Sequence, residues 1–161
     1  MKDYLVKDPW KIIEDEYHPE YNQISESIFS IGNGRMGQRA NFEETFTGQT
    51  LQGSYIAGIY YPDKTRVGWW KNGYPEYFAK VINAPNWIGI RIAVNGEALD
   101  LNQCQKVTGF RREFNMKEGW YQRSFEAVLQ NGMRISVSAM RFLSMTRDEL
   151  GAIRYSLTLL D

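Results

Sequence analysis

Residues 120–142 read WYQRSFEAVLQNGMRISVSAMRF, and this stretch decides the fold. An Asn-Gly pair at 131–132 separates two runs that are rich in aromatic and β-branched residues. Asn-Gly between such runs is the strongest short-range signal of a β-hairpin, because both residues tolerate a positive φ. The sequence therefore predicts one strand from Trp120 to Gln130 and a returning strand from Met133 to Phe142.

The neighbouring segments also carry an apolar residue at every second position. Isoleucine or valine occupies alternate positions from Ile88 to Val94, and a second Asn-Gly pair follows at 95–96. Apolar residues also alternate with polar ones from Ile153 to Leu159. Such alternation is typical of strands with one buried face. Several short strands with turn signals between them predict a mainly β, antiparallel β-sandwich in a single domain.

Two short helical segments are expected within this β-rich chain. Pro9 suits the first position of a helix, which predicts a helical turn over Asp8–Glu14. A second helical turn is predicted over Asp148–Ala152.

The amino-acid composition narrows the classes of function that the protein could have. The 161 residues are 43% hydrophobic, enough for one domain with a core, and the 19 basic residues balance the 19 acidic ones. Nucleic-acid binding gains little support from scattered charges. Cys104 and His18, each alone of its type, cannot form a metal cluster. Early charges exclude a secretion signal and the longest apolar run, Tyr55–Tyr61, is too short to span a bilayer, so we expect a cytoplasmic protein.

The glycines at 32, 34 and 37 match the pattern of a dinucleotide-binding turn. That turn requires a helix directly after it and a ribose-binding acid about 20 residues on. No helical stripe follows Gly37, and no acidic residue lies between Thr45 and Pro62. We therefore interpret Asn33-Gly34 as a tight reversal between extended segments, with positive φ at both residues.

Acids and arginines surround this reversal. Arg39 can hold a carboxylate through two hydrogen bonds, and its candidate partners are Glu26, Glu43, Glu44 or a carboxylate of another domain. The candidates for a domain interface or an active-site rim are Asn33, Gly34, Arg39, Glu43 and Glu44. The alternative for Glu43-Glu44 is a solvated or ion-paired edge. On an extended strand these neighbours point to opposite faces and cannot be a catalytic pair.

A second candidate site is the glycine-rich aromatic loop that contains Trp69, Trp70 and Tyr74. Exposed rings of this kind can stack on the apolar face of a sugar. The alternative, which we favour, is that they cover the end of the sandwich or dock on a neighbouring domain.

Residues 26–44 resemble the N-terminal signature of glycoside hydrolase family 65, which contains maltose, kojibiose and trehalose phosphorylases and related hydrolases. The matching residues are Glu26, Phe29, Ser30, Gly32, Asn33, Gly34, Gly37, Arg39, Glu43 and Glu44. Ala40 replaces the usual glycine, and Phe114-Asn115-Met116 departs mildly from a Leu-Asp-Met motif. Further matching segments are 53–60, 83–87, 94–97, 141–144 and 150–155. The resemblance runs from Glu26 to the last residue.

This resemblance implies a sandwich of the galactose mutarotase-like, or supersandwich, type. It places catalysis in a later (α/α) barrel of the same chain, where a Glu protonates the leaving group. Inorganic phosphate, as a co-substrate, or water attacks the anomeric carbon of an α-linked glucose disaccharide with inversion. It implies no cofactor or metal for this domain, which would pack on the barrel and support a homodimer and the active-site rim. The runner-up is a free-standing carbohydrate-binding module using the aromatic loop.

Overall fold

Six antiparallel strands form the main sheet of the protein, which a computed structural model describes for residues 4–66 and 73–160. In spatial order they are β1 (Val6–Lys7), β2 (Lys11–Glu14), β10 (Lys106–Asn115), β11 (Trp120–Val128), β12 (Arg134–Leu143) and β13 (Gly151–Leu160). The four long strands β10 to β13 lie side by side and are continuous in sequence. The sheet is thus built outward from the hairpin of residues 120–142.

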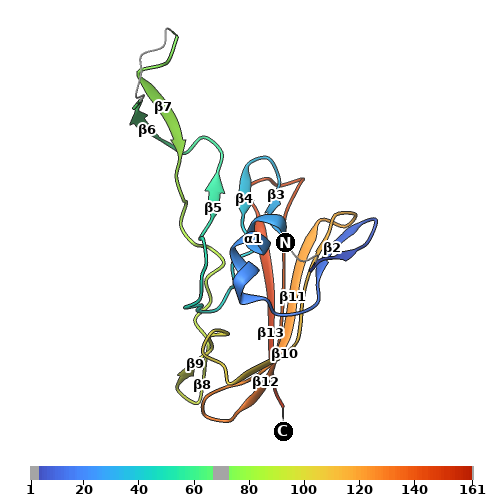
Figure 1. Cartoon of the computed structure of the whole chain (residues 1–161). Helices are drawn as coiled ribbons and strands as arrows, with labels where there is room; N and C mark the ends of the chain where they lie inside the picture. The colour runs from blue at the N-terminus through green and yellow to red at the C-terminus, as the bar shows by residue number, and fades with distance from the viewer. Residues whose placement is uncertain (1–3, 67–72, 161) are drawn as a thin grey trace.

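One α-helix and three small sheets complete the described chain (Figure 1). A 3-10 turn, Pro19–Tyr21, leads directly into α1 (Asn22–Ile28). The small sheets are β3 (Ile31–Gly32) with β4 (Met36–Gln38) and β5 (Ser54–Ile56), β6 (Tyr60–Lys64) with β7 (Tyr77–Val81), and β8 (Ala93–Val94) with β9 (Glu97–Ala98). Figure 1 shows β6 and β7 projecting away from the rest of the molecule.

The apolar core lies on one face of the main sheet. Along β11, the buried residues Tyr121, Phe125 and Ala127 alternate with more exposed ones. One cluster packs around Phe42, Leu99, Phe110, Phe125 and Val137, and a second around Phe29, Ile31, Tyr121 and Leu143. The loops and the segment that follows the helix therefore supply the second layer over this face, with apolar side chains that lose contact with water.

The hairpin predicted at residues 120–142 is confirmed. Strands β11 and β12 pair from Trp120–Phe142 to Val128–Arg134, and Gly132 in the turn has a φ of +82°. The strand predicted near the end of the chain is confirmed as β13, which pairs with β12 along its whole length.

The second Asn-Gly turn is also confirmed, with φ of +51° at Asn95 and +83° at Gly96. Its strands, β8 and β9, are only two residues long. Alternating burial nevertheless continues back to Ile88. One further backbone bond, from Leu99 N–H to the Ile92 carbonyl at 3.0 Å, extends this hairpin, and the N–H of Ile90 instead donates to the carbonyl of Glu43 at 2.7 Å.

Both helical predictions are wrong. Residues 11–14 form β2, because this segment pairs with β10 from Lys11–Asn115 to Glu14–Arg112. Residues 151 and 152 already belong to β13, and a turn closed by a hydrogen bond from Leu150 N–H to the Arg147 carbonyl precedes them. Pairing with an existing strand outweighs weak local helix signals in both places.

The helix that does form, α1, was not predicted. Its buried residues are Asn22, Ser25 and Glu26, so its inward face is polar and carries no apolar stripe.

The mainly β, antiparallel fold class is confirmed, while the supersandwich subtype stays a prediction. Within residues 4–66 and 73–160, no helix has the length and apolar character needed to cross a bilayer.

Candidate functional site

A row of three buried arginines crosses the middle of the main sheet. Arg112 lies on β10, Arg123 on β11 and Arg141 on β12, and each is at most 1% exposed. Arg112 and Arg123 are direct cross-strand partners, while Arg141 pairs with Tyr121, two residues from Arg123. All three project into the space between the sheet and the layer above it. Buried charge of this kind is tolerated only with close counter-charges.

Glu43 and Glu44 supply that counter-charge for two of the arginines. The Nη1 and Nη2 groups of Arg123 donate to the two carboxylate oxygens of Glu44 at 2.7 and 2.6 Å. Arg123 Nη2 also donates to Glu43 at 2.8 Å, and Arg141 Nη1 lies 2.6 Å from the other Glu43 oxygen. Residues 43 and 44 form a bend, not a strand, so the adjacent side chains converge. The ion-paired alternative describes their surroundings, but the pair is buried and not solvated.

Burial and ion pairing act in opposite directions on the pKa values here. Burial raises the pKa of Glu43, but Arg141 and Arg123 outweigh it and leave that pKa below its ordinary value. Burial lowers the pKa of Arg123, but Glu44 and Glu43 outweigh it and raise that pKa. Burial and then Glu44 raise the pKa of Tyr155, whose hydroxyl donates to Glu44 at 3.3 Å. Glu43 is therefore ionised at neutral pH and cannot serve as a proton donor.

Aromatic rings complete the surroundings of the guanidinium groups. The Cζ atom of Arg123 lies 4.5 Å from the centre of the Phe42 ring, and that of Arg141 lies 4.6 Å from the Tyr121 ring. Contacts of this type are worth about 2 kcal/mol when they are desolvated. The arginines are thus held by rings as well as by carboxylates.

Arg112 forms a looser ion pair. Its Nε atom lies 3.2 Å from Glu14 Oε2, and its Nη2 donates to Asn22 of α1 at 3.0 Å. Burial raises the pKa of Glu14 and outweighs the opposite effect of Arg112. These contacts attach the helix and strand β2 to the centre of the sheet.

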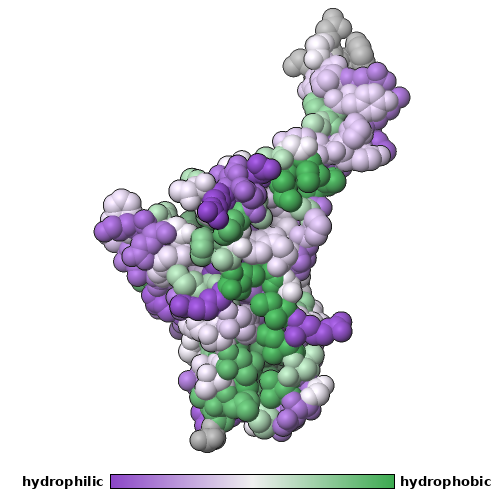
Figure 2. Space-filling model, turned by 180° about the vertical axis from the view of Figure 1, so that it is seen from behind, coloured by the Kyte–Doolittle hydropathy of each residue, from purple (hydrophilic) through white to green (hydrophobic). Residues whose placement is uncertain are grey.

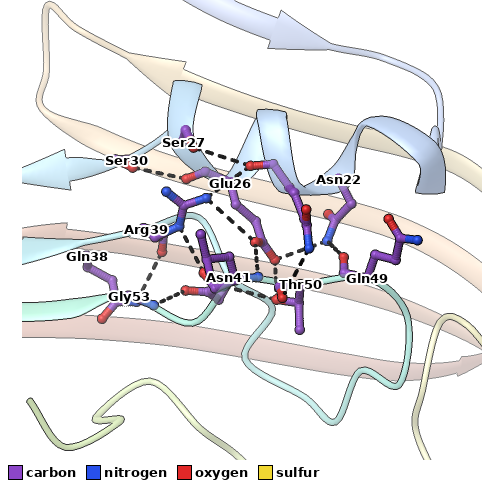
Figure 3. A network of polar contacts seen from close by, with 12 residues as sticks. Asn22, Glu26, Ser27, Ser30, Gln38, Arg39, Asn41, Gln49, Thr50 and Gly53 are labelled. Atoms are coloured by element: carbon purple, nitrogen blue, oxygen red, sulfur yellow. Dashed lines mark hydrogen bonds and ion pairs between the residues drawn. The ribbon is translucent and has the colours of Figure 1, made fainter. Parts of the chain in front are cut away.

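Glu26 and Arg39 belong to a polar network at the end of α1, which Asn22 links to Arg112 (Figure 3). The Glu26 carboxylate accepts hydrogen bonds from Asn22 Nδ2 at 3.0 Å and from the backbone N–H of Leu51 at 2.8 Å. Arg39 Nη2 lies 3.9 Å from Glu26, and Arg39 donates to the carbonyls of Leu51 and Gln23 at 2.9 and 3.0 Å. Of the candidate partners within the described chain, Arg39 therefore lies against Glu26 and not against Glu43 or Glu44.

The reversal at Asn33-Gly34 joins β3 to β4. Gly34 has a φ of +88°, whereas Asn33 does not have a positive φ, so the prediction for Asn33 is wrong. The Asn33 side chain explains the difference, because its Oδ1 accepts from the backbone N–H of Met36 at 2.7 Å. Its Nδ2 donates to the carbonyls of Ser144 and Asp148 at 2.8 and 2.9 Å. Asn33 thus ties this turn to the loop between β12 and β13.

Strand β4, not a helix, follows the glycine turn. The rejection of a dinucleotide-binding turn is therefore confirmed, because no helix N-terminus is present to meet a pyrophosphate.

The aromatic loop is only partly described. Trp69 and Trp70 lie outside the described residues. Tyr74 is 40% exposed, and its ring meets the ring of Phe78 edge-on, with the centres 6.2 Å apart.

A cleft of about 360 Å³ opens beside Glu43 and Glu44. Asn41, Thr50 and Asn86 contribute to its lining. Arg123 and Arg141 occupy the carboxylate oxygens of Glu43, and Arg123 also occupies those of Glu44, on the inner side of this cleft. Among residues 4–66 and 73–160, no group of three or more His, Cys, Asp or Glu side chains is arranged to hold a metal ion.

The three buried arginines were not among the candidate residues predicted from the sequence. A signal was present, since Arg123 occupies an inward position between Tyr121 and Phe125. A charged residue in the apolar register of a strand predicts a buried counter-charge.

Comparison with known proteins identifies the family. The family model described as "Glycosyl hydrolase family 65, N-terminal domain" matches residues 12–161. Maltose phosphorylase of Bacillus subtilis (strain 168) is 50% identical over 148 residues, which is 92% of this chain and 19% of that protein. Kojibiose phosphorylase of Thermoanaerobacter brockii is 32% identical over 98% of this chain and 19% of its own length.

A solved structure, of a putative kojibiose phosphorylase from the human microbiome, superposes with a TM-score of 0.86 and 36% identity. The match covers 97% of this chain and 20% of that one. The chain therefore spans about a fifth of the length of the relatives that it matches. The family match and the shared fold lead to one conclusion: this chain belongs to glycosyl hydrolase family 65, as its N-terminal domain.

Proposed function

We propose that this chain is the non-catalytic N-terminal domain of an enzyme that cleaves α-glucosidic disaccharides, by phosphorolysis or hydrolysis, with inversion. A catalytic (α/α) barrel in the same polypeptide would carry the proton donor, and inorganic phosphate would be the co-substrate of a phosphorylase. The domain would pack on that barrel, support a homodimer and contribute to the rim of the active site.

The observation that carries this proposal is that the buried acid pair Glu43-Glu44 is bound to arginine. Inverting cleavage needs a protonated acid whose pKa is raised, together with a base or a phosphate site across the bond. The Glu43 carboxyl has the opposite property, because its pKa is lowered and its oxygens bind Arg123 and Arg141. The length of the relatives supports a separate catalytic region.

The buried network suits a rigid supporting role. Arg123 and Arg141 fix the segment around Glu43 and Glu44 to the sheet, and Asn33 fixes the glycine turn to the loop after β12. The interface candidates that reach the surface, Asn33, Gly34 and Arg39, are therefore held in place before any partner arrives, which reduces the entropic cost of docking.

The test compares residues 1–161 with the full-length polypeptide. Each is incubated with maltose, trehalose and kojibiose, with and without inorganic phosphate. We expect glucose or glucose 1-phosphate from the full-length polypeptide alone. Product from residues 1–161 above a boiled control would refute the proposal.

A further inference from the structure

The hairpin of β6 and β7 has little support from the rest of the described chain. We call residues 59–66 and 73–82 the arm. All residues of β7, and all but Asp63 of β6, are exposed. The large exposed side chains of its strands are Tyr60, Tyr61, Tyr77, Phe78 and Val81, which are 46 to 58% exposed. Among the described residues, β6 and β7 pair only with each other, and a two-stranded hairpin is marginally stable in water.

The two faces of the arm differ in chemistry. Residues directly opposite in an antiparallel pair project to the same face. One face carries the pairs Tyr60–Val81, Pro62–Ala79 and Lys64–Tyr77, and the other carries Tyr61–Lys80 and Asp63–Phe78. The second face contains an ion pair, with Lys80 Nζ 3.0 Å from Asp63 Oδ2. We call the first face, which carries one charged residue at its outer end, the apolar face.

The apolar face continues into the body of the domain. Tyr60 and Val81 line one side of a cleft of about 260 Å³, and Met36, Tyr55 and Ile56 line the other. Gly34 of the reversal also borders this cleft. Figure 2 shows hydrophobic surface gathered at the base of the arm. Arm, cleft and glycine turn thus form one continuous surface.

We propose that the apolar face of the arm and this cleft together dock onto the remainder of the same polypeptide, an inference that rests on the proposed function. A hairpin that is stable only when covered needs a partner at every protein concentration. A domain on the same chain meets that need, because tethering gives it an effective concentration in the millimolar range. A second copy of the chain would cover the arm only above its dissociation constant.

The length of the relatives agrees with a docking partner on the same polypeptide. A stable interface uses about 800 Å² and 20–30 residues on each partner, which exceeds one face of the arm alone. The apolar face and the cleft together comprise 13 residues and would form part of such an interface. Relatives of which this chain spans 19% have ample additional surface to meet it.

The experiment is hydrogen exchange on the full-length polypeptide. Three forms are compared: the unmodified protein, Tyr60→Ser with Val81→Ser on the apolar face, and Tyr61→Ser with Lys80→Ser on the other face. Each variant removes one tyrosine and its cross-strand partner, and none of these side chains lies in the core. Arm amides should exchange about 100-fold slower than free peptide at every protein concentration. The apolar-face variant should raise that exchange about tenfold, and the control should leave it unchanged.

Three results would overturn the inference: arm amides that exchange at the free-peptide rate, protection only at concentrations where the protein self-associates, or equal effects of the two variants. The second result would assign the surface to another copy of the chain. Lysine cross-links between residues 1–161 and the remainder test the proposed function separately. Cross-links with an unprotected arm would refute this inference alone, and their absence would refute the proposed function itself.

Discussion

Arg123 binds Glu44 through two parallel hydrogen bonds, 2.7 and 2.6 Å long, and neither side chain is exposed to water. The two residues are separated by 79 positions in sequence. A bidentate arginine–carboxylate pair fixes the relative orientation of the two side chains and is stronger than a hydrogen bond between neutral groups. This contact attaches the bend at residues 43 and 44 to the centre of the main sheet.

Removing the Arg123 guanidinium should strongly destabilise the domain. Arg123→Met leaves Glu44 buried without its main partner, so we expect a loss of about 3–5 kcal/mol in the free energy of unfolding. Urea denaturation of residues 1–161 measures it. Arg154→Met, at an exposed position of β13, is the matched control and should change stability by about 0.5 kcal/mol or less. Equal losses in the two variants would contradict the structural role of Arg123.

Acid should destabilise the domain through Glu43. A carboxyl with a lowered folded-state pKa adds stability that is complete above its ordinary pKa of 4.5 and is lost as pH falls through the lower folded-state value. Glu43→Gln should therefore flatten the fall in unfolding free energy below about pH 4.5. Glu14 has a raised pKa and the opposite sign, because its protonation in the folded state adds stability as pH falls toward 4.5. Glu14→Gln should remove that gain, and its effect should lie above about pH 4.5. Urea titrations between pH 3 and 7 distinguish the two; parallel curves would refute the assignment.

Arg39→Ala tests whether Arg39 serves the domain or a joint with another domain. Its described partners are Glu26, Gln23 and Leu51, all within this chain. We expect residues 1–161 to lose about 1–3 kcal/mol of unfolding free energy. Thermal unfolding of residues 1–161 and of the longer polypeptide that the proposed function implies, each with and without the substitution, measures the effect. A loss confined to the longer polypeptide would instead support a joint between domains.

Gly34→Val should cost stability through backbone strain alone. Gly34 has a φ of +88°, and a Cβ built there meets nothing within 4 Å. A β-branched residue in this region costs on the order of 1–2 kcal/mol. Gly37→Ala is the control, since its added Cβ meets Tyr55 at an ordinary 3.8 Å and its φ is not positive. Thermal melts that show the larger loss for Gly37→Ala would contradict this account.

Free sugars should not bind residues 1–161 through the aromatic loop. A Trp69–Trp70 platform would give at least low-millimolar affinity, worth about 4 kcal/mol. We expect no saturable change in tryptophan fluorescence on titration with maltose or trehalose. Saturable binding that Trp69→Ala or Trp70→Ala abolishes would favour the carbohydrate-binding module.

The sequence by itself determined the hairpins and the family. Alternating burial along residues 120–142 and the positive φ of Gly132 follow from local rules, because side-chain direction in a strand and turn geometry depend on adjacent residues. The signature of residues 26–44 pointed to the family that the comparisons show.

Only the tertiary structure decided which charges pair and where two segments fold. Lys11–Glu14 became a strand because β10, about a hundred residues away, offers it a hydrogen-bonding edge. Helix α1 has a polar inward face because Arg112 and the segment around Thr50 supply its partners. Arg123 selects Glu44 across 79 positions. The two-residue alternation of a strand is encoded in adjacent residues. The partner of a buried charge is set only by the side chains that the completed fold brings within a few ångströms.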